Sequence, residues 1–533
     1  MDQAFLIAVV DVATGRACAV STADDIPEAL AHFPALNETA DVELLNWVKF
    51  SRSNRPMDAV NAAHKWIEAT KPKSAIHGRW PAERRLPYLE VRYHEYESDD
   101  FDNRIVVLKK MALGLILQGD HTAGACLSGA IARSLCTRNR VSECLTFLNE
   151  GLRGQNSYFL EMFHYGATQL LHGRALNKPL TQLMTGQGDY FKNKFCPMPF
   201  TDLEITRHKA VAICCPSYLP HSIGDAAKEA GEKILNSNRA IEIRKSILDG
   251  NFAWCDWTKC PQIKNELLPE RDAVSDPEMR DHIARNTGVI DAPRHLRTSM
   301  DPTCNLHCPS CRKGPIAAKP EEVDEIMRIT DESLRPFMPK ARTIQMNGYG
   351  DVFSSRACRR ILETMSVAEH PNLKLHFITN GVLFTRKEWE KFPNIHNMVD
   401  SIRVSIDAVT KPTYDKIRLG GDFDRLKENL EFISSLRRDG VISEFIISMV
   451  VQHGNFREVE DFCEWGRALG CDLVLFEIVQ DWLGSDTYEE MAVNLPHHRA
   501  NPEFRAMVSR MKDRVADYNA RGGTEIQWDF GTV

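Results

Sequence analysis

The chain has 533 residues, of which 43% are hydrophobic and 26% are charged, a composition typical of globular proteins. Its 66 basic and 73 acidic side chains give a net charge of −7, which argues against a dedicated nucleic-acid binder. No run reaches the ~18 apolar residues that a membrane-spanning helix needs. Residues 1–11 lack the basic start of a signal peptide. We therefore predict a cytoplasmic protein without a membrane partner, with about three domains of ~150 residues each.

Residues 1–190 are predicted to form a mainly helical N-terminal domain. β-branched and apolar runs at 5–11 and 16–21 flank a turn signal at 13–15, which predicts a hairpin. Apolar residues at helical spacing then predict helices over 105–117, 123–135 and 142–152. This segment carries no motif with chemistry, so a scaffold or partner-docking role is expected.

Residues 191–294 differ from the N-terminal segment in their cysteine content. We expect a short β element, helices over 226–236 and 240–248, and then a cysteine-bearing loop. The whole chain has 15 cysteines, and cytosolic thiols stay reduced. Clustered cysteines therefore indicate metal ligands or catalytic groups rather than disulfides.

Residues 295–485 alternate strand-like and helical runs. Such alternation predicts parallel strands with helical crossovers, and six units predict a partial, open (β/α)6 barrel with functional groups at the carboxyl ends of its strands. The predicted strands are 295–300, 342–347, 374–379, 401–406, 444–451 and 473–479. The predicted helices are 321–338, 356–369, 385–391, 411–438 and 457–469. Residues 486–533 add a helix over 502–521 and a tail.

A CxxxCxxC motif formed by Cys304, Cys308 and Cys311 follows the first predicted barrel strand. Three thiolates within eight residues converge on one metal centre only if the loop wraps around it. Three cysteines on a four-iron cube leave one iron open, and an open position is where a substrate or cofactor binds. The alternatives are a structural zinc loop and cysteines that share this spacing by chance.

This motif and its position resemble those of the radical S-adenosylmethionine (SAM) superfamily. The resemblance implies a [4Fe–4S] cluster on the three cysteines and reductive cleavage of SAM to a 5′-deoxyadenosyl radical. The segment 347–351, Asn-Gly-Tyr-Gly-Asp, resembles the motif that binds the SAM amino group, through Gly348, Gly350 and Asp351. An ordinary glycine-rich turn is the alternative there.

Further SAM contacts are implied by the same resemblance. Asn380 would lie near the methionyl moiety, Ser405 would reach SAM, and Arg418 would clamp the SAM carboxylate. Gln452 and Asn455 are candidates for ribose contacts. A plain turn at Asn380 and a surface ion pair at Arg418 are the alternatives.

A second cysteine set precedes the barrel. Adjacent residues of a strand face opposite sides, so only one of Cys214 and Cys215 is expected to join Cys196, Cys255 and Cys260. Four thiolates form a closed set for a [4Fe–4S] cluster or for zinc. The pattern resembles the auxiliary-cluster modules called SPASM or twitch domains, which follow the barrel in many relatives but would precede it here.

The resemblance implies an enzyme that abstracts hydrogen from a substrate, with an electron donor such as flavodoxin or ferredoxin as partner. An auxiliary cluster favours oxidative modification, such as a crosslink or dehydrogenation, of a peptide or natural-product precursor. A redox-neutral epimerase of a sugar or small metabolite is one alternative. A non-catalytic metal-cluster scaffold is another.

Overall fold

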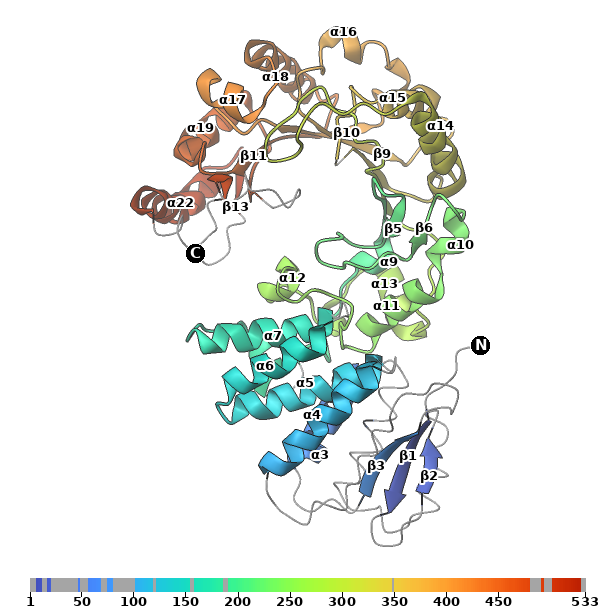
Figure 1. The fold of residues 1–533 in the computed structure, drawn as a ribbon. Helices are drawn as coiled ribbons and strands as arrows, with labels where there is room; N and C mark the ends of the chain where they lie inside the picture. Colours follow the sequence, from blue (N-terminus) through green and yellow to red (C-terminus); the bar gives the residue numbers. More distant parts are fainter. Residues whose placement is uncertain are drawn as a thin grey trace. The chain divides into compact units, whose positions relative to one another are not determined.

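A computed structural model describes residues 6–11, 17–20, 47, 56–68, 74–79, 101–117, 121–153, 158–185, 190–347, 349–479, 490–492 and 501–528. The chain divides into two compact units (Figure 1). The first comprises Met1–Phe200, Cys214–His221 and Asn238–Val289. The second comprises Thr201–Ile213, Ser222–Ser237 and Ile290–Val533. No helix among the described residues is both long enough and apolar enough to cross a membrane.

The first unit begins with a small antiparallel sheet of strand order β2-β1-β3. β1 (Leu6–Asp11) pairs with β2 (Ala17–Val20) on one side and with β3 (Ser74–Arg79) on the other. The predicted N-terminal hairpin is therefore confirmed, with strands slightly shorter than expected.

The helices that follow pack around α5 (His121–Thr137), which contacts all the other helices of this group. Gly129 lies so close to the Phe163 ring that a Cβ there would stand 2.8 Å from it. The buried Arg133 donates to the Leu183 carbonyl at 2.8 Å and to Asn61 Oδ1 at 2.7 Å, which ties the helices together. The other helices of the group are α3 (Pro56–Glu68), α4 (Phe101–Leu117), α6 (Val141–Leu152), α7 (Tyr158–Leu171) and α8 (Lys178–Thr185). The helices predicted over 105–117, 123–135 and 142–152 are therefore present, as α4, α5 and α6.

The rest of the first unit consists of short helices and loops that carry the second cysteine set. Arg244, fully buried in α11 (Asn238–Leu248), donates to the Pro199 carbonyl at 2.7 Å and to the Gly288 carbonyl at 3.2 Å. Its side chain thereby holds the start and the end of this segment together. The neighbouring helices are α9 (Met198–Thr201), α12 (Pro261–Lys264) and α13 (Pro277–Arg285).

The second unit is built on a ten-stranded sheet of order β13-β12-β11-β10-β9-β8-β7-β4-β5-β6. The strands from β13 to β4 are parallel to their neighbours, and β5 and β6 are antiparallel. The sheet remains open, as predicted. The strands are β4 (Asp202–Ile205), β5 (Ala210–Ala212), β6 (Gly224–Asp225), β7 (His295–Thr298), β8 (Thr343–Met346), β9 (Lys374–Thr379), β10 (Val399–Ser405), β11 (Glu444–Val451), β12 (Leu473–Ile478) and β13 (Glu525–Trp528).

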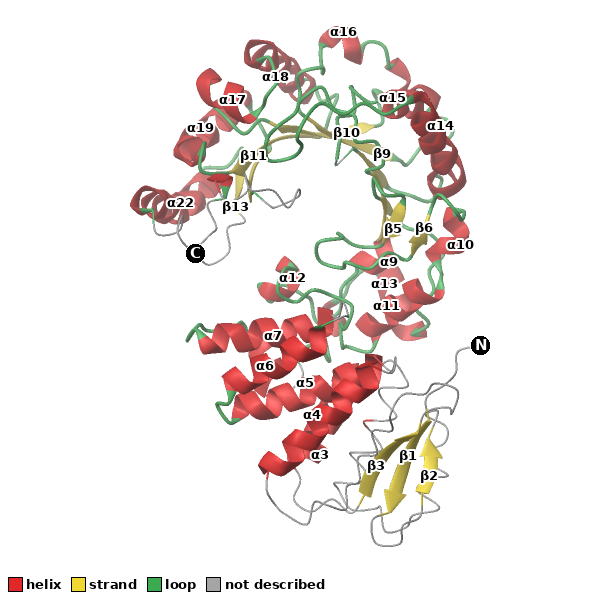
Figure 2. Ribbon diagram, viewed as in Figure 1, coloured by secondary structure: helices red, strands yellow, loops and turns green. Residues whose placement is uncertain are grey.

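Helices cover one face of the sheet, where alternate strand residues such as Leu296, Ile344 and Phe377 are buried (Figure 2). The opposite face carries half-buried polar side chains, including Arg297 and Gln345 in register on β7 and β8. The covering helices are α14 (Pro320–Ile329), α15 (Arg356–Thr364), α16 (Arg386–Trp389), α17 (Lys411–Ile417), α18 (Phe423–Arg438), α19 (Val459–Leu469) and α22 (Pro502–Ala520).

The mixed α/β class with a parallel sheet is confirmed, and the six predicted barrel strands are β7 to β12. The parallel strands β4 and β13 extend this series at either end, and neither was predicted as a barrel strand. The helix predicted over 411–438 is wrong as a continuous element, because the chain breaks between α17 and α18. The helix predicted over 226–236 is reduced to α10 (Gly231–Leu235) after β6.

Candidate metal centre and cofactor site

The CxxxCxxC loop is folded back on itself at the carboxyl end of β7. Cys304 forms an antiparallel bridge with Ile316, in which its amide donates to the Ile316 carbonyl at 3.1 Å. Within the loop, the Cys311 amide donates to the Cys308 carbonyl at 2.9 Å. The His307 amide donates to the Leu419 carbonyl at 3.0 Å and so anchors the loop to the segment after α17. These backbone contacts fold the loop back on itself, so that its three cysteines lie on one wrapped segment.

Each thiol of the loop has its own hydrogen-bond donor. Asn380 Nδ2 lies 3.6 Å from Cys304 Sγ, and the Leu306 amide lies 3.5 Å from the same sulfur. Two guanidinium groups serve the other thiols. Arg418 Nη1 lies 3.9 Å from Cys308 Sγ, and Arg312 Nη2 lies 3.4 Å from Cys311 Sγ. Donors to thiolate sulfurs favour the charged, ligating form.

Burial opposes ionisation of the Cys304 and Cys308 thiols. It raises the pKa of Cys304 to about 11, with a smaller contribution from the nearby Asp351 carboxylate. Burial also raises the pKa of Cys308, and the Arg418 cation partly offsets that effect. Without a bound cation the thiols of Cys304 and Cys308 are therefore protonated at neutral pH, and a metal centre would displace their protons.

The donor set fits a cubane cluster with an open iron. Among the described residues, no group of three or more His, Cys, Asp or Glu side chains is spaced to hold a metal ion. In a cube, each cysteine would bind a separate iron rather than one shared ion. The chemistry of the side chains, and not their spacing around a single ion, therefore tests the fit. Cys308 and Cys311 each influence a neighbouring thiol of the loop electrostatically. Three thiols on a four-iron cube would leave one position open.

The loop after β8 is held in a tight conformation. Asn347 has φ +60°, and its Oδ1 accepts from the amides of Tyr349 at 3.2 Å and of Gly350 at 2.8 Å. A Cβ on Gly350 would stand 2.5 Å from the carbonyl oxygens of Asp301 and Thr303, so only glycine fits. Gly348 lies outside the described residues.

Asp351 is 1% exposed, and four donors saturate its carboxylate. Oδ1 accepts from the amides of Phe353 and Ser354 at 3.0 and 3.1 Å. Oδ2 accepts from Thr379 Oγ1 at 2.7 Å and from the Asn380 amide at 2.9 Å. This arrangement favours a positioning role for Asp351, linking the ends of β8 and β9, over the direct contact expected from sequence.

Arg418 lies between the loop and the end of β10. Its Nη2 lies 2.8 Å from Asp407 Oδ2 in a buried ion pair. Burial alone would lower the pKa of Arg418, but the charges of Asp407 and Cys308 outweigh burial and raise it. Asp407, at φ +67°, also accepts from the Val450 amide at 2.7 Å. Arg418 is thus a buried cation beside Cys308, not the surface ion pair considered as the alternative.

Three buried donors at these strand ends have no hydrogen-bond partner among the described residues: Asn347 Nδ2, Arg418 Nε and Gln452 Nε2. Unmet buried donors are costly, and a ligand with oxygen acceptors would satisfy them. Asn455 differs, because its Nδ2 already donates to the carbonyls of Asp407 and Val450 at 2.8 and 3.0 Å. Ser405 is half-buried and lies 3.3 Å from Ser448 Oγ on the neighbouring strand.

The second cysteine set lies entirely in the first unit. Cys196 precedes α9, Cys214 and Cys215 follow β5, and Cys260 is the N-cap of α12. The turn from Cys255 to Cys260 is fixed by Asp256, whose Oδ1 accepts from the Thr258 hydroxyl at 2.6 Å and from its amide at 3.0 Å.

Four of these thiols influence one another electrostatically. Burial raises the pKa of Cys255, and the charges of Cys196, Cys214 and Cys260 raise it further. Burial likewise raises the pKa of Cys214, with contributions from Cys196 and Cys260. Cys214 raises the pKa of Cys255, whereas Cys215 raises that of Cys260, so either of the adjacent cysteines stays a candidate for the fourth member.

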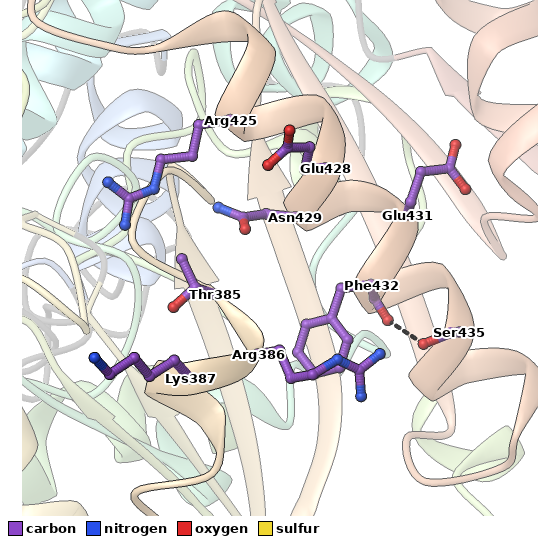
Figure 3. A pocket seen from close by; sticks show the side chains of 9 residues that line it. All are labelled: Thr385, Arg386, Lys387, Arg425, Glu428, Asn429, Glu431, Phe432 and Ser435. Atoms are coloured by element: carbon purple, nitrogen blue, oxygen red, sulfur yellow. Dashed lines mark hydrogen bonds between the residues drawn. The ribbon is translucent and has the colours of Figure 1, made fainter.

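A hollow of about 510 Å³ lies between the start of α16 and α18 (Figure 3). Arg386 stacks 4.4 Å from the Phe432 ring, and the Ser435 hydroxyl donates to the Phe432 carbonyl at 2.7 Å. Asn429 Nδ2 donates to the carbonyls of Gly381 and Val382 at 2.8 and 2.9 Å. Asn429 thereby supports the turn that carries Asn380, and the hollow holds none of the predicted site residues.

Sequence reasoning missed Arg312 and the donor role of Asn347. An arginine directly after the third cysteine of the motif was the available signal for Arg312. Asn347 precedes the glycines of its motif, and asparagine is among the few residues that tolerate a positive φ. Sequence reasoning also missed the ion pair with Asp407, because it assigned Arg418 to SAM alone.

Comparison with protein families matches residues 299–466 to the radical SAM superfamily. Among curated proteins, a probable GTP 3′,8-cyclase of Methanococcus maripaludis is 29% identical over 189 residues, 35% of this chain and 59% of that protein. The mycofactocin maturase MftC of Mycobacterium ulcerans is 24% identical over 204 residues, 38% of this chain and 52% of that protein. The chain thus spans little more than half the length of these relatives.

The solved structures that match this chain are more distant in sequence. Streptococcus suis SuiB bound to its precursor peptide SuiA is 14% identical with a TM-score of 0.34, over 47% of this chain and 53% of that chain. The protein anSMEcpe with bound AdoMet is 17% identical with a TM-score of 0.32, over 44% of this chain and 63% of that chain.

Proposed function

From the match of residues 299–466 to the radical SAM superfamily, we propose that the chain is a radical SAM enzyme that removes hydrogen from a peptide or natural-product precursor and leaves it oxidised, as a crosslink or a new double bond. The observation that carries the proposal is the wrapped loop whose three thiols each have a separate donor. When bound, a [4Fe–4S] cluster and SAM supply the 5′-deoxyadenosyl radical that such chemistry requires.

The chain's part in this chemistry is to hold and orient. Cys304, Cys308 and Cys311 would hold the cluster, and their donors would stabilise the thiolates. Arg418 would meet the SAM carboxylate with its unpartnered Nε, while Asp407 fixes its orientation. Gln452 Nε2 would donate to a ribose oxygen.

The amino group of SAM needs acceptors rather than donors. The carboxylate of Asp351 is already saturated, so backbone carbonyls of the motif loop are the acceptors that remain. Gly350 permits the close packing of that loop against Asp301 and Thr303. Ser405 and Asn380 would border the same space.

The set Cys196, Cys214, Cys255 and Cys260 supports the oxidative outcome. Four thiols leave no open position, so the group they hold is suited to electron transfer rather than to substrate binding. The substrate would lose a hydrogen atom and then a further electron and proton, with that electron leaving through the auxiliary site. A relative named as a maturase is consistent with a peptide substrate.

The test is anaerobic reconstitution with iron and sulfide, followed by SAM and dithionite. We expect about eight irons per chain and formation of 5′-deoxyadenosine. Cys304→Ala, Cys308→Ala and Cys311→Ala should each abolish that product. Retained cleavage in any of the three would remove that cysteine from the ligand set, and no cleavage by an intact, reducible cluster would revive the scaffold alternative.

About four irons with retained cleavage would indicate zinc at the second set and a redox-neutral reaction. In that case deuterium from solvent would appear in the product. The two outcomes therefore separate the proposed oxidation from the epimerase alternative.

A further inference from the structure

Arg312 ties together three separate segments around the cysteine loop. Its side chain is buried, and Nη1 donates to the Pro302 carbonyl at 2.7 Å, just beyond β7. Nη2 donates to the Tyr349 carbonyl at 2.6 Å, in the motif loop after β8, and lies 3.4 Å from Cys311 Sγ. One planar guanidinium thus spans strand end, cysteine loop and motif loop, which a single ammonium cannot do.

The hydrogen bonds of Arg312 go to two carbonyls and one sulfur, and among the described residues no ion pair joins it to a carboxylate. A buried cation without a counter-charge is costly. Because Nη2 lies 3.4 Å from Cys311 Sγ, a negatively charged centre held by the three cysteines would supply that counter-charge.

A second arginine supports the arrangement from the turn between β4 and β5. Arg207 stacks 4.5 Å from the Tyr349 ring and donates to the Tyr349 hydroxyl. Arg312 lies 5.8 Å from the same ring. Tyr349 is held by both guanidiniums, so the motif loop cannot move without disturbing the contact to Arg312.

We propose that Arg312 positions the cysteine loop against the motif loop and that its fixed positive charge favours the reduced state of the cluster bound there. Reduction adds one electron and one negative charge to the site. Arg312 stays protonated throughout, so no proton moves with the electron. The inference rests on the proposed function, since it presumes a cluster on Cys304, Cys308 and Cys311.

The test is an anaerobic redox titration of the reconstituted holoenzyme, followed by electron paramagnetic resonance of the reduced cluster. Arg312→Gln removes the charge, and we expect the ratio of reduced to oxidised cluster at a fixed potential to fall about tenfold. That fall corresponds to ~59 mV for a one-electron couple. The matched control Lys313→Gln removes the same charge from the exposed neighbour, and its ratio should stay at the wild-type value.

Arg312→Lys separates charge from geometry. It retains the charge, so the ratio should stay within about threefold of wild type. The dissociation constant for SAM should still rise at least about fivefold, because the bridge to Tyr349 is lost. If Arg312→Gln fails to load a cluster, the redox ratio and the SAM dissociation constant of Arg312→Lys test the inference instead.

An unchanged ratio in Arg312→Gln, or a tenfold fall in Arg312→Lys, would overturn the inference. Failure of the wild-type protein to form a reducible cluster would instead refute the proposed function. The two failures are therefore distinguishable.

Discussion

Asp407 and Arg418 show how one side chain fixes another at the candidate site. They form an ion pair at 2.8 Å, with side chains only 3% and 11% exposed. The pair orients the guanidinium toward Cys308, and a lone buried cation would remain if Asp407 lost its charge. Removing one partner of a buried ion pair costs far more folding free energy than removing one partner of an exposed pair.

We predict that Asp407→Asn lowers the free energy of unfolding by about 3 kcal/mol and weakens SAM binding. Chemical denaturation and equilibrium binding of SAM measure the two effects. The control is Asp415→Asn on α17, whose contact to Lys411 is long and exposed, and it should change neither quantity. Equal behaviour of the two variants would show that the buried pair does not position Arg418.

At the scale of elements, the break between α17 and α18 places Arg418. Sequence periodicity predicted one helix over 411–438, yet the chain turns at Gly420, which has φ +86°. A Cβ on Gly421 would lie 2.5 Å from the Tyr414 hydroxyl. The adjacent glycines were the available signal, and the apolar pattern on both sides obscured it. The anchor from the His307 amide to Leu419 is a tertiary contact that no local pattern encodes.

Gly420→Ala tests the importance of this break. The positive φ should cost ~1–2 kcal/mol, and the new Cβ would lie 3.2 Å from the His307 ring, against the cysteine loop. We therefore expect SAM to bind more weakly while the iron content stays unchanged, as measured by binding and iron assays. Gly440→Ala has a similar strain at φ +71° with nothing within 4 Å, so it should lose stability but keep SAM affinity. A loss of affinity in both variants would attribute the effect to strain alone.

At the scale of the whole molecule, the sequence predicted the central strands of the sheet better than its ends. Strict βα alternation is a local pattern, so β7 to β12 were predicted, while the ligand role of Cys304, Cys308 and Cys311 stays a prediction from a compact motif. The parallel strand β4 comes about ninety residues before its neighbour β7, and no local pattern joins them. The sequence assigned Asp351 a contact to SAM. It could not show that four donors already occupy this carboxylate, because those donors come from segments that only the fold brings together.

The two cysteine sets belong to different compact units, and this division predicts that their clusters load independently. Cys255→Ala removes a thiol of the first unit whose pKa is raised by three other thiols of its set. The cysteine loop lies in the second unit, so it should remain intact. We expect the variant to lose about four irons and still to form 5′-deoxyadenosine from SAM, as measured by iron analysis and chromatography. Cys471→Ala, a buried thiol outside both sets, should keep the full iron content. Unchanged iron in Cys255→Ala would refute the auxiliary site, and loss of both clusters would show that the first unit must bind its metal before the second can.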